Sequence, residues 1–162
     1  QSYEKIHNDR LEMEKFIYRS LLIKKRLIET DEFDLGPRNV MNYGHSFGHA
    51  IESATNFAIP HGIAVTIGMD IANYAASKLG VSTNHHFERM HDVMYKNFQT
   101  YRNVHIDANS LMQALSKDKK NSSTHLRLIL PDQDGYIRIG LYDNNDALLD
   151  IIKDYFAIYG GQ

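Results

Sequence analysis

Residues 38–62 read RNVMNYGHSFGHAIESATNFAIPHG and bring three histidines into one short segment. His45 and His49 are four residues apart, so on a helix they share a face, with Cβ atoms about 5–6 Å apart. His61 follows a short connector and begins the next apolar stretch. Three imidazoles that converge from two adjacent helices are able to hold a divalent metal or to carry protons. A histidine pair at this spacing is also common on packed or solvent-facing helices, so the spacing alone leaves both interpretations open.

The residues next to the histidines strengthen the metal interpretation. Glu52 lies on the same helical face as His45, where it would be a metal ligand or a carboxylate that orients an imidazole. His45 and His61 both fall near predicted helix N-termini, where the positive end of the helix dipole disfavours imidazolium. A metal requires the neutral imidazole. Because glycine has no side chain, a substrate or another backbone has room to approach at Gly44, Gly48 and Gly62.

Five further polar residues are weighed as candidates for substrate contacts. Arg38 is able to hold a carboxylate or phosphate through its planar fork. Asn42 would either cap the following helix or donate to a substrate. Lys24, within LLIKKRLIE, has the composition of a surface lysine whose stem covers apolar neighbours. Lys119 and Lys120, in DKKN, form either a solvated charged loop or a contact for an anionic substrate.

The rest of the chain predicts a mainly α domain with one late β-hairpin. The run HGIAVTIGMDIANYAASKLG is rich in small residues, which predicts a buried helix that ends at Gly80. HLRLILP and YIRIGLY are strand-like and are separated by the turn sequence DQDG. The other helices are predicted over residues 9–30, 84–99, 109–116 and 145–158. The remaining histidines are expected at the surface: His7, His85, His86, His91, His105 and His125.

Composition excludes several classes of protein. The chain has 162 residues, a net charge of −2 and no cysteine, so disulfides, thiolate metal ligands and a cysteine nucleophile are excluded. The balanced charge disfavours nucleic-acid binding, and no apolar run is long enough to span a bilayer. No GxGxxG motif is present to hold a nucleotide. Because the chain begins with Gln1, we expect it to be an excerpt of a longer protein.

NYGHSFGHAIE followed by HGIAVTIGM resembles the 3-dehydroquinate synthases and their relatives, the sugar phosphate cyclases. The residues that fit the family pattern are Arg38, Asn42, Tyr43, Gly44, His45, Ser46, Gly48, His49, Ala50, Glu52, His61, Gly62, Ala64, Val65, Gly68 and Met69. The resemblance implies that residues 1–162 form the C-terminal helical domain, which binds metal and substrate. An N-terminal α/β domain that binds NAD would lie outside this chain, with the active site between the two domains.

The resemblance also assigns roles to the histidines. His45 and His61 would hold a divalent metal, zinc or cobalt, together with a glutamate that precedes this chain. His49 would then contact the substrate phosphate and transfer a proton. Glu52 would be structural or would orient a ligand from the second shell.

The implied reaction is that of a phosphorus–oxygen lyase in the shikimate pathway of aromatic amino acid biosynthesis. NAD transiently oxidises a carbinol of a heptulosonate phosphate, phosphate leaves by elimination, and the ring reopens and closes to give 3-dehydroquinate. The metal would act as a Lewis acid. Lys24 and Arg38 would face the substrate carboxylate, and Asn42, His49 and Lys119 or Lys120 would lie nearer the phosphate. The resemblance further implies a cytoplasmic enzyme, a homodimer, and no activity for this chain alone.

Three positions depart from the family pattern: Asp34 and Ile63, where the synthases usually have glutamate, and Met41, where leucine is common. Ile63 favours a related cyclase that acts on another sugar phosphate. The sequence also leaves open a non-catalytic helical binding domain, and a metal-dependent alcohol dehydrogenase of the iron type has a similar architecture. NYGHSFGHAIE favours the cyclases over that last class.

Overall fold

A computed structural model describes residues 6, 8–33, 36–118 and 121–160. The chain divides into two compact units, an N-terminal unit of residues 1–41 and a C-terminal unit of residues 42–162. Within the described ranges, no helix combines the length and the apolar character that crossing a membrane requires.

The N-terminal unit consists mainly of helix α2 (Arg10–Thr30), followed by the 3₁₀ helix η1 (Pro37–Asn42). The carboxylate of Asp9 accepts hydrogen bonds from the backbone N–H groups of Leu11 and Glu12, which fixes the start of α2. No residue of α2 is buried. Its large apolar side chains include several that are more than half exposed: Leu11, Ile17, Tyr18, Leu21 and Ile23.

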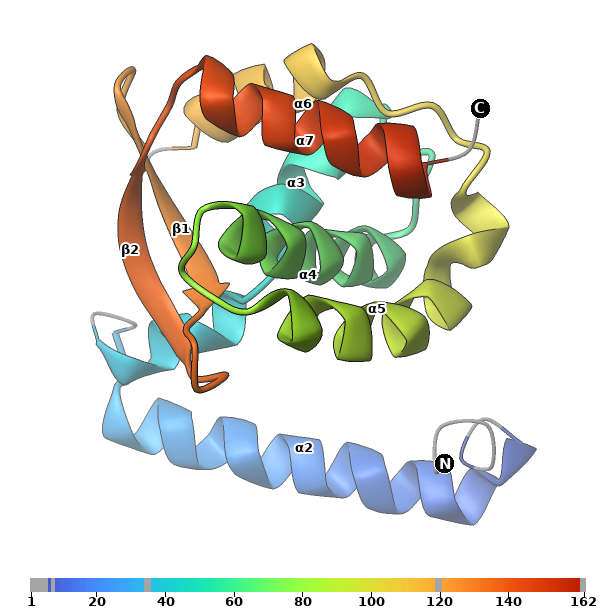
Figure 1. The fold of residues 1–162 in the computed structure, drawn as a ribbon. Helices are drawn as coiled ribbons and strands as arrows, with labels where there is room; N and C mark the ends of the chain where they lie inside the picture. Colours follow the sequence, from blue (N-terminus) through green and yellow to red (C-terminus); the bar gives the residue numbers. More distant parts are fainter. Residues whose placement is uncertain (1–5, 7, 34–35, 119–120, 161–162) are drawn as a thin grey trace. The chain divides into compact units, whose positions relative to one another are not determined.

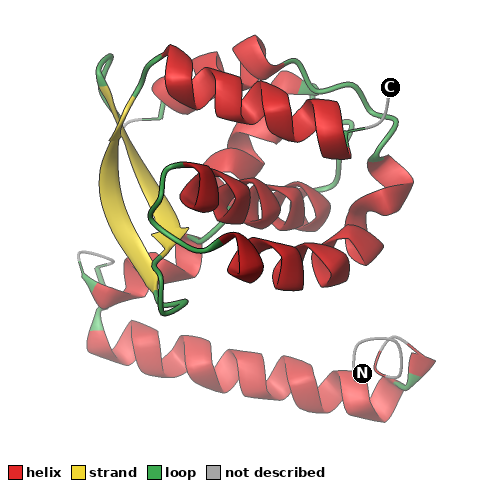
Figure 2. Cartoon of the chain, viewed as in Figure 1, coloured by secondary structure: helices red, strands yellow, loops and turns green. Residues whose placement is uncertain are grey.

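The C-terminal unit is a helical bundle closed on one side by a hairpin (Figure 1). Its helices are α3 (His45–Ala54), α4 (His61–Lys78), α5 (Asn84–Phe98), the 3₁₀ helix η2 (Gln99–Tyr101), α6 (Ala108–Ser116) and α7 (Asp146–Tyr159). Helix α4 lies at the centre, where it contacts α3, α5, α7 and the first strand. The predicted class, mainly α with one late hairpin, is confirmed (Figure 2).

Helix α4 takes the central position because its small side chains allow neighbours to approach from all sides. Its buried residues include Ala64, Gly68, Ala72 and Ala75. The helix ends at Lys78 with Leu79 as its C-cap, and Gly80 follows the cap as predicted, with a φ of 72°. The N–H groups of the two residues after the C-cap bond back to the carbonyls of Ser77 and Ala76, which satisfies the free end of the helix.

Helices α3 and α4 touch through backbone rather than side chains. A Cβ atom added at Gly68 would lie 2.2 Å from the carbonyl oxygen of Gly44 and 2.7 Å from the nitrogen of Gly48. Gly44, the N-cap of α3, has a φ of 79°, which an L side chain adopts only with strain. Three glycines therefore set the spacing between the two helices that carry the histidines.

The hairpin joins β1 (His125–Pro131) and β2 (Ile137–Asp143) as an antiparallel pair, with Ile129 opposite Ile139. The turn begins at Asp132, whose carboxylate accepts from the N–H groups of Asp134 and Tyr136. Strand β1 is buried along most of its length and packs on α4, while β2 alternates between exposed and half-buried residues. The predicted strands and turn are confirmed.

The predicted helices are confirmed to within a few residues, and Asn145 caps α7 by accepting from the N–H of Leu148. One capping prediction is wrong. Asn42 does not cap α3, because the helix begins at His45 and Gly44 occupies the N-cap without a side-chain bond. The two 3₁₀ helices were not predicted, since short 3₁₀ segments have no apolar period of their own.

We expect Gly68→Ala to lower the free energy of unfolding by about 2–4 kcal/mol, because overpacking forces the α3 and α4 backbones apart. Gly62→Ala is the matched control: it lies in the same helix, and an added Cβ there meets no atom within 4 Å. Its stability should stay unchanged or rise by about 0.5–1 kcal/mol. Urea unfolding of both variants measures the difference, and equal stabilities would contradict the backbone contact.

Candidate metal centre

The three histidines of the sequence motif meet at one corner of the C-terminal unit. His45 and His49 come from the first two turns of α3, and His61 is the first residue of α4. Their ring centroids form a triangle with sides of 5.7 Å (His45–His49), 5.6 Å (His45–His61) and 5.7 Å (His49–His61). The predicted convergence of three imidazoles from two helices is confirmed.

The orientation of His45 is set by the backbone before α3. Its Nδ1 lies 3.4 Å from the carbonyl oxygen of Tyr43. Because a carbonyl only accepts, Nδ1 carries the proton and Nε2 keeps its lone pair. The Tyr43 hydroxyl in turn donates to the side-chain oxygen of Asn73 on α4, so the segment that holds His45 is tied to the central helix.

The orientation of His61 is set by Glu52. Its Nδ1 lies 3.1 Å from Oε1 of Glu52. Since a carboxylate only accepts, Nδ1 donates, and in the neutral imidazole Nε2 keeps the lone pair. The Glu52 side chain is 12% exposed, whereas that of His61 is 55% exposed. A largely buried carboxylate thus holds an accessible imidazole, the arrangement that commonly orients metal-binding histidines.

Two of these histidines and Glu52 form a group whose ligand atoms lie close together. One ligand atom each of His49, Glu52 and His61 fall within 4.8 Å of one another. Imidazole nitrogens and carboxylate oxygens suit a divalent ion of the zinc or cobalt type. These three residues therefore offer a donor set that fits such an ion. It differs from the pair that the family resemblance implies, since it contains His49 and Glu52 and lacks His45.

The lowered pKa of His45 also favours metal binding. Burial lowers the pKa of the His45 imidazole below its ordinary value, and the neighbouring His49 and His61 lower it further. The hydrogen bond to the Tyr43 carbonyl, second in size to burial, and the charge of Glu52 act in the opposite direction without reversing the shift. His45 is therefore held in the neutral form that binds a metal.

The structure describes only some of the other residues predicted for the site. Asn42 is half-buried at the end of η1, where the C-terminal unit begins. Lys24 and Arg38 belong to the N-terminal unit; Lys24 is exposed, and the Arg38 guanidinium donates to the carbonyl of Glu32 at 2.8 Å. Lys119, Lys120 and Asp34 lie outside the described residues. Ile63 is half-buried and packs against the core.

A buried polar network between α4, α5 and α7 was missed. The fully buried Asp70 accepts from Nδ1 of His91 and from the hydroxyl of Tyr155, each at 2.7 Å. The expectation that His91 is a surface residue is wrong, since only 15% of its side chain is exposed. The signal in the sequence was the pair Asp70 and Asn73 within an otherwise apolar helix.

Comparison with known proteins places this chain in a family and agrees with its helical fold. The family described as "3-dehydroquinate synthase C-terminal" matches residues 1–121. The chain is 35% identical over 145 residues to the 3-dehydroquinate synthase of Streptococcus pyogenes serotype M5 (strain Manfredo), and 31% identical over 144 residues to that of Helicobacter pylori (strain P12). Each alignment covers 88% of this chain, and they cover 41% and 42% of those proteins. The chain belongs to the 3-dehydroquinate synthase C-terminal family, and it spans about two fifths of the length of these relatives.

The fold is shared with solved structures of lower identity. A crystal structure of 2-deoxy-scyllo-inosose synthase matches with a TM-score of 0.72 and 22% identity, over 89% of this chain and 41% of that chain. A second structure of 2-deoxy-scyllo-inosose synthase, in complex with carbaglucose-6-phosphate, NAD+ and Co2+, matches with a TM-score of 0.62 and 22% identity. That match covers 75% of this chain and 36% of that chain.

We expect His45 of the metal-free folded protein to titrate below about 6.5, and the same imidazole in urea-unfolded protein to titrate near that ordinary value. At a pH between the folded and the unfolded pKa of His45, the unfolded chain binds more protons than the folded chain. This histidine therefore lowers the free energy of unfolding as the pH falls through about 6.5 toward the folded pKa. NMR titration of the imidazole measures both. A folded pKa at or above the unfolded pKa would show that burial does not determine the pKa of His45.

Proposed function

We propose that this chain is the metal- and substrate-binding part of a 3-dehydroquinate synthase-type enzyme, a phosphorus–oxygen lyase of aromatic amino acid biosynthesis. The reaction is the NAD- and metal-dependent elimination of phosphate from a heptulosonate phosphate, followed by ring closure to 3-dehydroquinate. The observation that carries the proposal is the triangle of three imidazoles, in which His45 and His61 are each anchored through Nδ1. Membership of the family supports the particular reaction.

The proposal assigns the metal to His45 and His61. Both rings are anchored through Nδ1, which leaves Nε2 of the neutral imidazole for a metal. Burial favours the neutral form of His45. A further carboxylate would come from the NAD-binding domain, which we expect to precede this chain. When bound, zinc or cobalt would supply Lewis-acid polarisation of the substrate oxygens.

His49 is assigned to the substrate phosphate and to proton transfer. It is exposed, and its ring lies 5.7 Å from those of both proposed ligands, within reach of a substrate held beside them. It lies near the start of α3, and its ring is close to that of His61 at the start of α4. The N-terminus of a helix favours an anion. Glu52 is assigned to the orientation of His61 rather than to metal binding, because its Oε1 already accepts from His61 Nδ1.

The remaining substrate contacts follow the family pattern. Lys24 and Arg38 are assigned to the carboxylate of the substrate, and Asn42 with Lys119 or Lys120 to the phosphate. Arg38 suits a carboxylate because its planar fork donates two parallel hydrogen bonds. For the complete enzyme we expect a homodimer that works in the cytoplasm on a small sugar phosphate, without nucleic-acid or membrane partners.

A related cyclase that acts on a sugar phosphate without a carboxylate is the second candidate. Ile63 favours it, because a half-buried apolar residue stands where the synthases usually have glutamate. The structural similarity to 2-deoxy-scyllo-inosose synthase is compatible with either reaction, since identity of 22% shows only the fold.

Phosphate release by the full-length enzyme separates the two candidates. With NAD and cobalt, we expect release from 3-deoxy-D-arabino-heptulosonate 7-phosphate and none from glucose 6-phosphate. His45→Ala should lower the rate by about 100-fold or more, as expected for loss of a bound Lewis acid. His85→Ala, an exposed histidine of α5, is the matched control and should leave the rate unchanged. Release from the hexose phosphate alone would establish the second candidate.

We expect Glu52→Ala to weaken metal affinity by about 10–100-fold, the usual effect of losing a carboxylate that orients a histidine ligand. Glu52→Gln should lose less, because its amide oxygen still accepts from His61 Nδ1. Competition with a chromophoric chelator measures the affinities. Glu88→Gln, at an exposed position of α5, is the control. Unchanged affinity in Glu52→Ala would refute the positioning role.

A further inference from the structure

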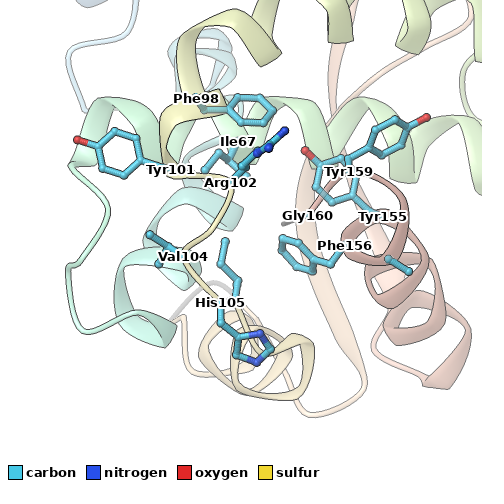
Figure 3. Close-up of a pocket in the computed structure, with 12 residues that line it drawn as sticks. Ile67, Phe98, Tyr101, Arg102, Val104, His105, Tyr155, Phe156, Tyr159 and Gly160 are labelled. Carbon is cyan, nitrogen blue, oxygen red and sulfur yellow. The ribbon is translucent and has the colours of Figure 1, made fainter. Parts of the chain in front are cut away.

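A cavity lies beside α4, on a different side of the helix from His61. Its volume is about 320 Å³, within the range of small-molecule sites. Figure 3 shows it between the segment that joins η2 to α6 and the last turns of α7. Ile67 of α4 lines it, six residues after His61, and at 3.6 residues per turn that is a rotation of about 240° around the helix. The cavity is therefore separate from the histidine triangle.

Five of the twelve residues that line this apolar cavity are phenylalanines or tyrosines. Phe98, Tyr101, Tyr155 and Phe156 line it, and Figure 3 shows the Phe156 ring turned inward and the Tyr101 hydroxyl turned away. Rings of this kind bury the flat apolar body of a ligand and leave orientation to a few polar groups.

A polar compartment adjoins the apolar cavity. It has a volume of about 440 Å³ and shares Arg102 and Tyr159 with the first cavity. To these it adds His91, Tyr95 and Asn103, all of which carry hydrogen-bonding groups. The two compartments together have an apolar end and a polar end, joined at Arg102.

Arg102 supplies a positive charge at this junction. Within the part of the chain that the structure describes, Arg102 forms no ion pair, and its Nη1 donates only to the Tyr95 hydroxyl at 3.4 Å. Figure 3 shows its guanidinium directed across the mouth of the cavity toward the tyrosines of α7. The remaining N–H groups of the fork match the geometry of a carboxylate.

One buried carboxylate fixes a wall of each compartment. Oδ2 of Asp70 accepts from Tyr155, which lines the apolar cavity, and from His91, which lines the polar one. Oδ1 of Asp70 is buried without a hydrogen-bond partner among the described residues. An unpaired buried oxygen lowers the free energy of unfolding, and packing of the core does not require it. Walls held in place before a ligand arrives reduce the entropy lost on binding.

We propose that these compartments bind a small molecule built from an aromatic ring and a carboxylate. The ring lies in the cavity between Phe98 and Phe156, and the carboxylate pairs with the Arg102 guanidinium, with Asn103 and His91 beside it. This site is separate from the histidine centre, so it does not depend on the function proposed above.

Binding of 3-phenylpropionate to the purified protein tests the proposal, measured by saturation-transfer NMR and calorimetry. We expect saturable binding with a dissociation constant of about 1 mM or below, as ligand efficiency allows for a molecule of this size. The neutral isostere 3-phenylpropanamide should bind about 10-fold more weakly, because it lacks the charge-assisted bond.

Three variants locate the site. Arg102→Gln should weaken binding of 3-phenylpropionate by about 10-fold and leave the amide unaffected. Ala157→Phe, at an exposed position of α7 that lines the cavity, should weaken both ligands because the new ring occupies the space. Arg89→Gln, an exposed arginine outside both compartments, is the control for charge. No saturable binding, equal affinity for acid and amide, or an Arg102→Gln protein that binds like the parent would each overturn the proposal.

Discussion

The contact between the α3 and α4 backbones at Gly44, Gly48 and Gly68 is the constraint on which the histidine centre depends. A side chain at Gly68 would occupy the position of the Gly44 carbonyl. Close approach at this point brings the first turns of α3 beside the N-terminus of α4, and His45 and His49 thereby reach His61. The glycines are therefore part of the site, although none of them has a side chain to contribute.

Once the helices are in contact, each proposed metal ligand is oriented by its own acceptor. The Tyr43 carbonyl holds His45, and Glu52 holds His61. Both rings thus use Nδ1 as a donor and keep Nε2 for a ligand. Tyr43 is itself bonded to Asn73 on α4, so the orientation of His45 depends on the same pair of helices that sets its position.

Much of this structure follows from patterns of short range. The apolar period located the helices, DQDG located the hairpin, and Gly80, two residues after Lys78, located the end of α4. Each of these signals acts within a few residues. The meeting of the three histidines was predicted from spacing and resemblance. The Asp70 network was not, because its bonds to His91 and Tyr155 join residues far apart in the chain, and no local pattern encodes such pairing. Of the two interpretations of Asn42, the helix cap is wrong, because the N-cap is Gly44, two residues later, where φ is positive.

The central claim is that His45 and His61 together hold a divalent metal. X-ray absorption of the zinc- or cobalt-loaded full-length enzyme tests it most directly, because imidazole rings give a distinct outer-shell scattering. We expect scattering from two imidazoles per metal, reduced to one in His45→Ala and in His61→Ala and unchanged in His49→Ala. A spectrum that loses an imidazole in His49→Ala but not in His45→Ala would contradict the assignment.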